Sequence, residues 1–222
     1  MWFCFHADCN VSGRTGVTLS RTAGQTAFRT VRDTPAPVSD KVFEIPDTFV
    51  SLSRRVEAES YLRRVGAYDA YLSGAADIRY DVRMNRVVFL IKDGKRVVDA
   101  AGRSLDGRGP KWYRYWSSTL PFTCVRTRSV AIVVEDASSA CCVHGVSTGV
   151  AILGTNLLTK HVDILKQYDR VFVALDKDAT DNAISMVRKL NSHVPTRLMV
   201  LHTDLKNMEK DAKNRKSREK QG

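Results

Sequence analysis

The chain has 222 residues and a formal net charge of +11, with 35 Lys and Arg against 24 Asp and Glu residues. This length allows one sizeable domain or two small ones. A hydrophobic fraction of 43% is enough to build a core and excludes a wholly disordered chain. The basic excess favours a polyanionic partner, most simply a nucleic acid.

Membrane and secreted classes are disfavoured by the same sequence. No apolar run approaches the roughly 20 residues needed to cross a bilayer. The opening MWFCFH lacks the basic and long apolar regions of a secretory signal. Five cysteines, odd in number and scattered, do not suggest a disulfide framework. We expect a cytoplasmic protein with no membrane partner.

Residues 1–40 are rich in Thr, Ser, Arg and Gly and end in the linker-like DTPAPVSD. The pattern then changes. EAESYLRRVGAYDAYLSGA has apolar residues at helical spacing and is interrupted by Gly66, which predicts two short helices. RVVFLI and KRVVDA are predicted strands, and Lys92-Asp93-Gly94 between them favours a hairpin turn.

From about Ser129 strands and helices alternate. VAIVVE, GVAILG, RVFVAL and TRLMVLH are short, continuously apolar runs, as expected for parallel strands covered on both faces. NLLTKHVDILKQY and DNAISMVRKLNSH have helical periods between them, and DASSACCVHGV is a shorter helix candidate. The alternation predicts an α/β domain. The last residues form a basic tail.

Acidic residues follow three of these strands. Asp176 and Asp178 stand two positions apart, so both carboxylates can face one side. Glu135 and Asp204 end other strands at the same predicted edge of the sheet, where open α/β sheets bind ligands. Such a cluster suits Mg²⁺ or Mn²⁺, and two such ions can serve phosphoryl transfer. The alternative is that these are ordinary solvated acids beside a helix start.

The segments VVEDASSA, AILGTN, FVALDKDAT and LHTDLKN resemble the Toprim domain shared by bacterial-type primases, topoisomerases and some nucleases. The resemblance implies a parallel four-stranded sheet with flanking helices. It also implies metal-dependent phosphodiester chemistry at Glu135, Asp176 and Asp178, with Asp204 as a further acid near the metal. Gly154, Thr155 and Asn156 resemble a loop beside the site, and Lys177 is a candidate nucleotide contact.

The preceding segment, from Ala76 to Trp116, resembles the smaller α+β subdomain that precedes Toprim in phage- and bacterial-type DNA primases. The resemblance rests on Gly102-Arg103 and on Pro110-Lys111-Trp112, and it implies a catalytic contribution from Arg103 and Lys111. Basic residues are dense here and aromatic ones lie among them, a composition that suits phosphate contacts and base stacking. The candidate nucleic-acid or nucleotide contacts are Arg79, Arg83, Arg86, Arg103, Arg108, Lys111 and Trp112.

Cys4, His6 and Cys9 are candidate zinc ligands, because family primases carry an amino-terminal zinc ribbon. A structural zinc usually takes four ligands. Either the true start lies further upstream, or the ribbon is degenerate, or a distant ligand completes it. We therefore expect a zinc-ribbon remnant and linker over 1–40, a basic primase subdomain over 41–127, a Toprim domain over 128–208 and a basic tail over 209–222.

The combined pattern predicts a DNA primase that makes short RNA primers on single-stranded DNA from NTPs, in phage replication and hence in the host-cell cytoplasm. No Gly-x4-Gly-Lys-Ser/Thr phosphate loop is present, so a separate replicative helicase is the expected partner. Two alternatives remain: a metal-dependent Toprim nuclease, and a non-catalytic subunit that binds single-stranded DNA.

Overall fold

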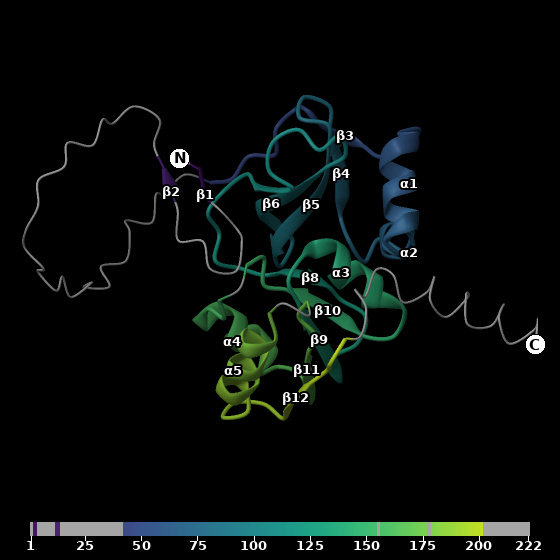
Figure 1. The fold of residues 1–222 in the computed structure, drawn as a ribbon. Helices are drawn as coiled ribbons and strands as arrows, with labels where there is room; N and C mark the ends of the chain where they lie inside the picture. Colours follow the sequence, from purple (N-terminus) through teal and green to yellow (C-terminus); the bar gives the residue numbers. More distant parts are fainter. Residues whose placement is uncertain (1, 4–11, 14–41, 155, 177–178, 202–222) are drawn as a thin grey trace, which may run out of the picture. The chain divides into compact units, whose positions relative to one another are not determined.

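The computed structural model describes residues 2–3, 12–13, 42–154, 156–176 and 179–201 (Figure 1). The chain divides into two compact units, Met1–Val42 and Phe43–Gly222. In the first unit, β1 (Trp2–Phe3) pairs antiparallel with β2 (Ser12–Gly13). The zinc candidates Cys4, His6 and Cys9 lie outside the described residues.

The second unit contains two five-stranded sheets, and the first of these is antiparallel throughout. Its strands follow the chain in order: β3 (Phe49–Ser51), β4 (Ile78–Asp81), β5 (Arg86–Asp93), β6 (Arg96–Ser104) and β7 (Trp112–Arg114). The predicted hairpin is confirmed. Asp93 pairs with Arg96, so Gly94 and Lys95 make the turn, and Gly94 has a positive φ of 58° that a two-residue hairpin turn requires.

Two short helices cover one face of this sheet, and the sequence predicts both helices. They are α1 (Val56–Arg64) and α2 (Tyr68–Leu72), separated at Gly66 with φ 70°. Leu62 of α1 packs with Val87 and Phe89 of β5 in the larger core. The opposite face carries a smaller apolar cluster that includes Phe49 and Val88.

The second sheet has the order β12-β11-β9-β10-β8. Four strands are mutually parallel: β9 (Val130–Val134), β10 (Thr148–Ala151), β11 (Arg170–Val173) and β12 (Thr196–Leu198). The fifth, β8 (Phe122–Cys124), pairs antiparallel with β10 at one edge. This edge strand and β3, β4 and β7 were not predicted from the sequence.

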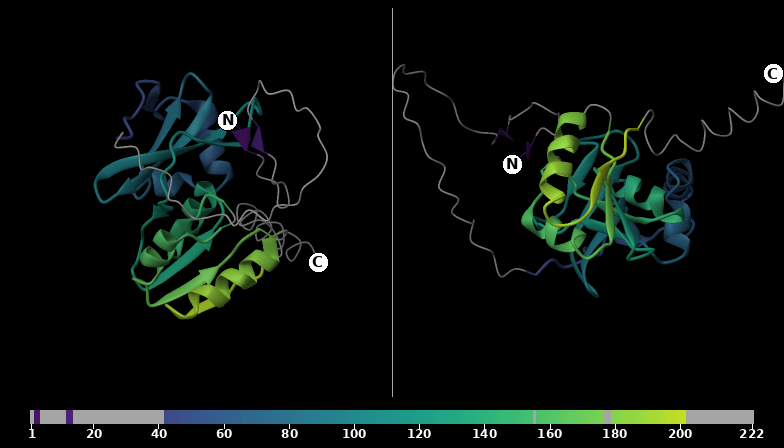
Figure 2. Two further views of the ribbon diagram at one scale, coloured as in Figure 1. Left: turned by 90° about the vertical axis from the view of Figure 1, so that its left-hand side faces the viewer. Right: turned by 90° about the horizontal axis from the view of Figure 1, so that it is seen from below.

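Helices cover both faces of the second sheet, which explains its continuously apolar strands (Figure 2). On one face lie α4 (Thr159–Leu165) and α5 (Thr180–Leu190), packed on Ala131 and Val133. On the other lies α3 (Ala137–Cys142), packed with Ile132 and Val134 and continued by the 3₁₀ turn Val143–Gly145. No helix of the described residues is long and apolar enough to span a membrane.

Candidate functional site

Two of the predicted acids lie at the carboxyl ends of neighbouring strands. Glu135 follows β9 directly, and Asp176 stands three residues after the end of β11. These strands are adjacent and parallel with Val133 opposite Val173, and the Ala174 N–H donates to the Val133 carbonyl at 2.9 Å. The pairing therefore brings Glu135 and Asp176 to one edge of the sheet, and both are half-buried.

The segment after β10 runs beside the same edge. The N–H of Leu153 donates to the carbonyl of Glu135 at 2.9 Å, and Leu153 itself has a positive φ of 58°. This turn brings Gly154 next to the acidic edge, and Asn156 is exposed beyond it. Thr155, Lys177, Asp178 and Asp204 lie outside the described residues.

The helix that follows Glu135 fixes its backbone. Asp136 is the N-cap of α3 and accepts a hydrogen bond from the Ser139 N–H at 3.0 Å. Strand β10 approaches this helix closely, because a Cβ at Gly149 would lie 2.0 Å from the carbonyl oxygen of Ala140. Glu135 is thus placed between a buried strand and a tightly packed, capped helix.

The donor chemistry of this edge fits a hard divalent cation, since both described acids offer carboxylate oxygens. Among the residues that the structure describes, no group of three His, Cys, Asp or Glu side chains converges on a metal position. Glu135 and Asp176 are therefore two candidate ligands by position, and a complete set would require further oxygens.

Arg103 is the basic residue with the most distinctive surroundings. It lies on β6 opposite Trp112 of β7, and its guanidinium carbon is 5.8 Å from the centre of the Trp112 ring and 6.0 Å from that of Tyr61. The side chain is half-buried, and its Nε is buried without a hydrogen-bond partner among the described residues. Aromatic faces accept no conventional hydrogen bond, so the Nη donors of Arg103, unlike its buried Nε, stay available for an anion.

Tyr61 connects this arginine to the acidic edge. Its hydroxyl forms a hydrogen bond with the Ser138 hydroxyl at 2.6 Å, and both residues are buried. Ser138 belongs to α3, which begins directly after Glu135 and Asp136. An arginine without a described carboxylate partner is therefore linked through two side chains to the helix that fixes the backbone of Glu135.

Sequence reasoning missed Tyr61 and Ser138. The available signal was the YLRR run in α1, where a tyrosine stands beside basic residues. Arg64 is also near this ring, with its guanidinium carbon 5.6 Å from the ring centre. The pairing with Ser138 joins positions 77 apart in the chain and has no local signature.

The other basic candidates differ in exposure. Arg83, Arg108 and Lys111 are exposed, whereas Arg79 is 3.1 Å from Asp77 in an ion pair. Trp112 is half-buried, with its ring tilted against Phe89 at 5.8 Å between centroids. Arg86, predicted as a nucleic-acid contact, is instead buried at 2% exposure, which removes it from the binding surface. Strand β5 lies in the middle of its sheet, and Arg86 turns into the interior there.

No protein-family model matches the sequence, and no curated protein matches it. Solved structures do match. The chain is similar to a structure of the DnaG catalytic core, with a TM-score of 0.57 and 18% identity over 77% of this chain and 75% of that one. The Escherichia coli primase catalytic core gives a TM-score of 0.55 and 18% identity, over 72% and 71% of the two chains.

The primase fragment of the bacteriophage T7 primase-helicase protein gives a TM-score of 0.53 and 12% identity, over 83% of this chain and 80% of that one. This chain has the fold of a bacterial- and phage-type primase catalytic core. It spans 49% of the Aquifex aeolicus primase structure with zinc-binding and RNA polymerase domains, at a TM-score of 0.51 and 20% identity over 77% of this chain. The two sheets described above are those of this primase-core fold.

Proposed function

We propose that this protein is a DNA primase, a nucleotidyltransferase that joins NTPs into short RNA primers on single-stranded DNA. The observation that carries the proposal is the position of Arg103. It lies between two aromatic rings, has no described carboxylate partner, and is joined through Tyr61 and Ser138 to the helix next to Glu135. An anion-binding cation and an acidic strand edge in one primase-core fold suit a reaction between phosphate groups.

In this proposal the second sheet is a Toprim domain. Glu135 and Asp176, with Asp178 and Asp204, hold Mg²⁺ or Mn²⁺, and the bound ion supplies Lewis-acid stabilisation of charge on the transferring phosphate. The residues of the chain have separate tasks. Arg103 donates to phosphate oxygens of the nucleotide or of the nascent strand. The sugar–phosphate backbone is contacted by Lys111, Arg83, Arg108 and Arg79. Gly154–Asn156 and Lys177 border the nucleotide.

We also propose the arrangement of the remaining chain. Residues 1–40 are a zinc-ribbon remnant and linker in which Cys4, His6 and Cys9 are candidate zinc ligands, residues 41–127 the basic subdomain, 128–208 the Toprim domain and 209–222 a basic tail. A separate replicative helicase is the expected partner. The expected setting is phage replication in the host-cell cytoplasm.

Incorporation of labelled NTPs on single-stranded templates tests the proposal. We expect primer synthesis that needs Mg²⁺ or Mn²⁺ and stops when EDTA is added. Asp176→Asn should lower its rate by at least about 100-fold, because losing one carboxylate ligand of the metal costs several kcal/mol of transition-state stabilisation. Asp163→Asn is the matched control, because Asp163 lies on α4 in an exposed pair with Lys166 at 2.7 Å. Primer synthesis that survives Asp176→Asn would rule the assignment out.

The same preparations separate the two other functions. Metal-dependent nicking of a plasmid without consumption of NTPs would favour a Toprim nuclease. Salt-dependent binding of single-stranded DNA that does not respond to Mg²⁺, with neither reaction present, would favour a non-catalytic subunit.

A further inference from the structure

Arg86 is a buried cation that the proposed reaction does not use directly. It is 2% exposed, and no carboxylate of the described residues lies within ion-pair distance. Burying a charge is costly unless hydrogen bonds compensate for the lost water. The groups that compensate for this one therefore indicate what the residue does.

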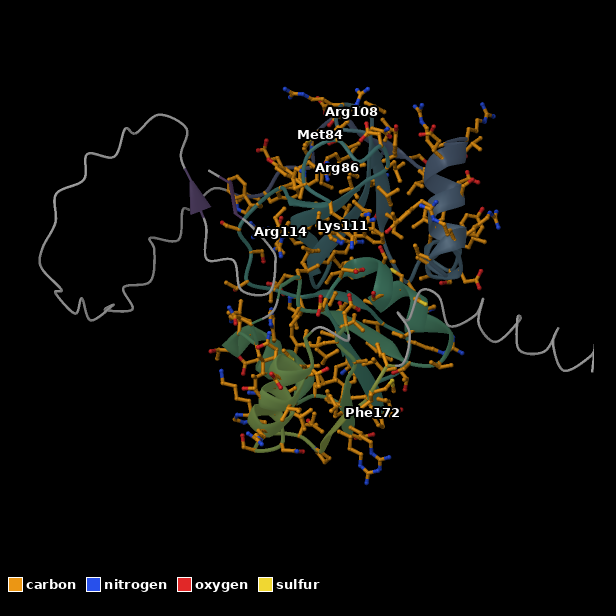
Figure 3. The ribbon with its side chains drawn as sticks, in the orientation of Figure 1. Met84, Arg86, Arg108, Lys111, Arg114 and Phe172 are labelled. Carbon is orange, nitrogen blue, oxygen red and sulfur yellow. The ribbon has the colours of Figure 1, made fainter. Side chains whose placement is uncertain are left out.

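The guanidinium group of Arg86 binds three backbone carbonyls. Nη1 donates to Gly102 at 3.2 Å and to Pro110 at 2.9 Å, and Nη2 donates to Arg108 at 3.3 Å. Gly102 is on β6, whereas Arg108 and Pro110 belong to the segment between β6 and β7. We name this segment, residues 105–111, the basic loop. Figure 3 labels Arg86 together with Arg108 and Lys111 of this loop.

The basic loop has no regular structure of its own to hold it. Gly107 and Gly109 both have positive φ, at 73° and 68°, so the backbone turns sharply at two places. Arg108 carries its side chain 91% exposed, and Lys111 is exposed as well. Besides Arg86, Ser104 holds the loop: its N–H donates to the Lys111 carbonyl at 3.1 Å, and its hydroxyl donates to Asp106 at 3.0 Å and to the Arg108 carbonyl at 3.3 Å. The Arg108 N–H also donates to Asp106 at 3.0 Å.

The interior is shaped around the Arg86 side chain. A Cβ at Gly102 would lie 3.2 Å from Cδ of Arg86 and 2.9 Å from the Tyr115 ring, so only glycine leaves both in place. The Tyr113 ring lies 5.7 Å from the guanidinium carbon. Three acceptors on two chain segments match the planar fork of an arginine and cannot all be reached by a lysine ammonium group.

We propose that Arg86 is a positioning residue: it fixes the basic loop so that Arg108 and Lys111 meet the backbone of the single-stranded nucleic acid. This inference rests on the proposed function for the identity of the ligand. It explains why an arginine occurs at a buried position of a basic subdomain, and it assigns Arg86 an effect on binding that acts only through the loop.

A double-mutant cycle tests this role by fluorescence anisotropy of a labelled oligo(dT) over a range of salt concentrations. Arg86→Gln alone, and Arg108→Ala/Lys111→Ala alone, are each expected to weaken binding roughly tenfold, the order expected for one or two lost phosphate contacts. In the Arg108→Ala/Lys111→Ala background, Arg86→Gln is expected to change neither the affinity nor the salt slope. Arg96→Gln, exposed on β6, is the control for removal of an arginine.

Additive losses would overturn the proposal, because they would mean that Arg86 contacts the nucleic acid itself or acts on the whole fold. The proposal would also be overturned if adding Arg86→Gln to the Arg108→Ala/Lys111→Ala variant lowered the salt slope of binding further. Arg86→Lys keeps the charge and is the variant to use if Arg86→Gln does not fold. We expect Arg86→Lys to bind as weakly as Arg86→Gln, and full rescue by lysine would contradict the role of the fork.

Hydrogen exchange gives a readout that needs no ligand. Arg86→Lys is expected to speed exchange at the Ser104 and Arg108 amides and to leave the Leu90 and Val133 amides at the wild-type rate. Unchanged exchange in the basic loop would overturn the proposal. A chain that makes no primers but shows this exchange pattern and a non-additive cycle would refute the proposed function and leave the role of Arg86 intact.

Discussion

At the scale of single residues, the molecule contains two arginines with opposite tasks. Arg86 donates to three carbonyls inside the protein, whereas Arg103 lies between the Tyr61 and Trp112 rings and makes no side-chain hydrogen bond with a described residue. Nε is buried without a hydrogen-bond partner among the described residues in both arginines, so the difference lies in their Nη groups. Those of Arg86 are used within the fold, and those of Arg103 stay available for a ligand. The sequence singles out Arg103 through the Gly102-Arg103 motif, but it predicts a nucleic-acid contact for both arginines and does not show that Arg86 is buried.

The Arg103 environment leads to a prediction about binding. Arg103→Gln should raise the KM for NTPs or the Kd for single-stranded DNA by roughly 10- to 100-fold, because a charged hydrogen bond contributes about 1.5–3 kcal/mol. Thermal unfolding should change little. Arg96→Gln, exposed on the same strand, should match the wild type in both measurements. An unchanged KM and Kd in Arg103→Gln would contradict the assignment.

Gly102 gives a second prediction at this scale, on stability. Its Cβ would lie 2.9 Å from the Tyr115 ring and 3.2 Å from Cδ of Arg86, so Gly102→Ala should lower the free energy of unfolding by about 1–3 kcal/mol. At Gly145 a Cβ would meet nothing within 4 Å, so Gly145→Ala should be close to neutral. Urea unfolding of the two variants makes the comparison, and equal stabilities would show that the interior accommodates the methyl group.

At the scale of elements, one hydrogen bond joins α1 to α3. Tyr61→Phe removes the hydroxyl and keeps the ring beside Arg103, so it should lower the free energy of unfolding by about 1–3 kcal/mol, the cost of leaving buried Ser138 without this partner. The double variant Tyr61→Phe/Ser138→Ala should be less destabilised than the sum of the single changes. Strict additivity in urea unfolding would show that the two hydroxyls do not stabilise each other.

At the scale of the whole molecule, His161 ties α4 to the segment between the two sheets. Its Nδ1 accepts a hydrogen bond from the Leu158 N–H at 3.2 Å, and its ring forms a hydrogen bond with the backbone of Thr119. Burial lowers the pKa of His161 to about 4, although the bond to Thr119 opposes this shift, and the charge of Arg114 lowers it further. The side chain is 1% exposed, and above about pH 4 the folded protein holds it neutral.

Stability should therefore depend on pH through His161. Between pH 6.5 and about 4 the unfolded chain binds a proton here that the folded chain does not, so the free energy of unfolding should fall as pH is lowered through this window. The loss approaches about 3 kcal/mol. Urea unfolding at several pH values should show a flatter dependence in His161→Gln, and the exposed control His193→Gln should keep the wild-type slope. If His161→Gln kept the wild-type dependence of stability on pH, a group other than His161 would cause that dependence.

Much of the architecture followed from local patterns. Helical spacing interrupted at Gly66, the Asp-Gly turn signal and the continuously apolar runs after Ser129 each predicted elements that the structure contains, because hydrophobic period and turn chemistry act over a few residues. That Glu135 and Asp176 lie at one sheet edge followed from the predicted parallel strands, whereas the structure showed that β9 and β11 are neighbours. The strands β3, β4, β7 and β8, of three or four residues each, were not predicted from the sequence and were identified by their pairing.

The sequence by itself determined the composition of the site: which strands end in acids, and which segment is rich in arginine and aromatic residues. The tertiary structure alone decided which cations remain available. Arg86 and Arg103 stand in the same kind of basic, β-forming surroundings, but neighbouring strands turn one towards buried carbonyls and the other towards two aromatic rings. Whether a charged side chain is used inside the fold or stays available for a ligand depends on the groups that replace its hydration water. These groups come from segments far away in the chain.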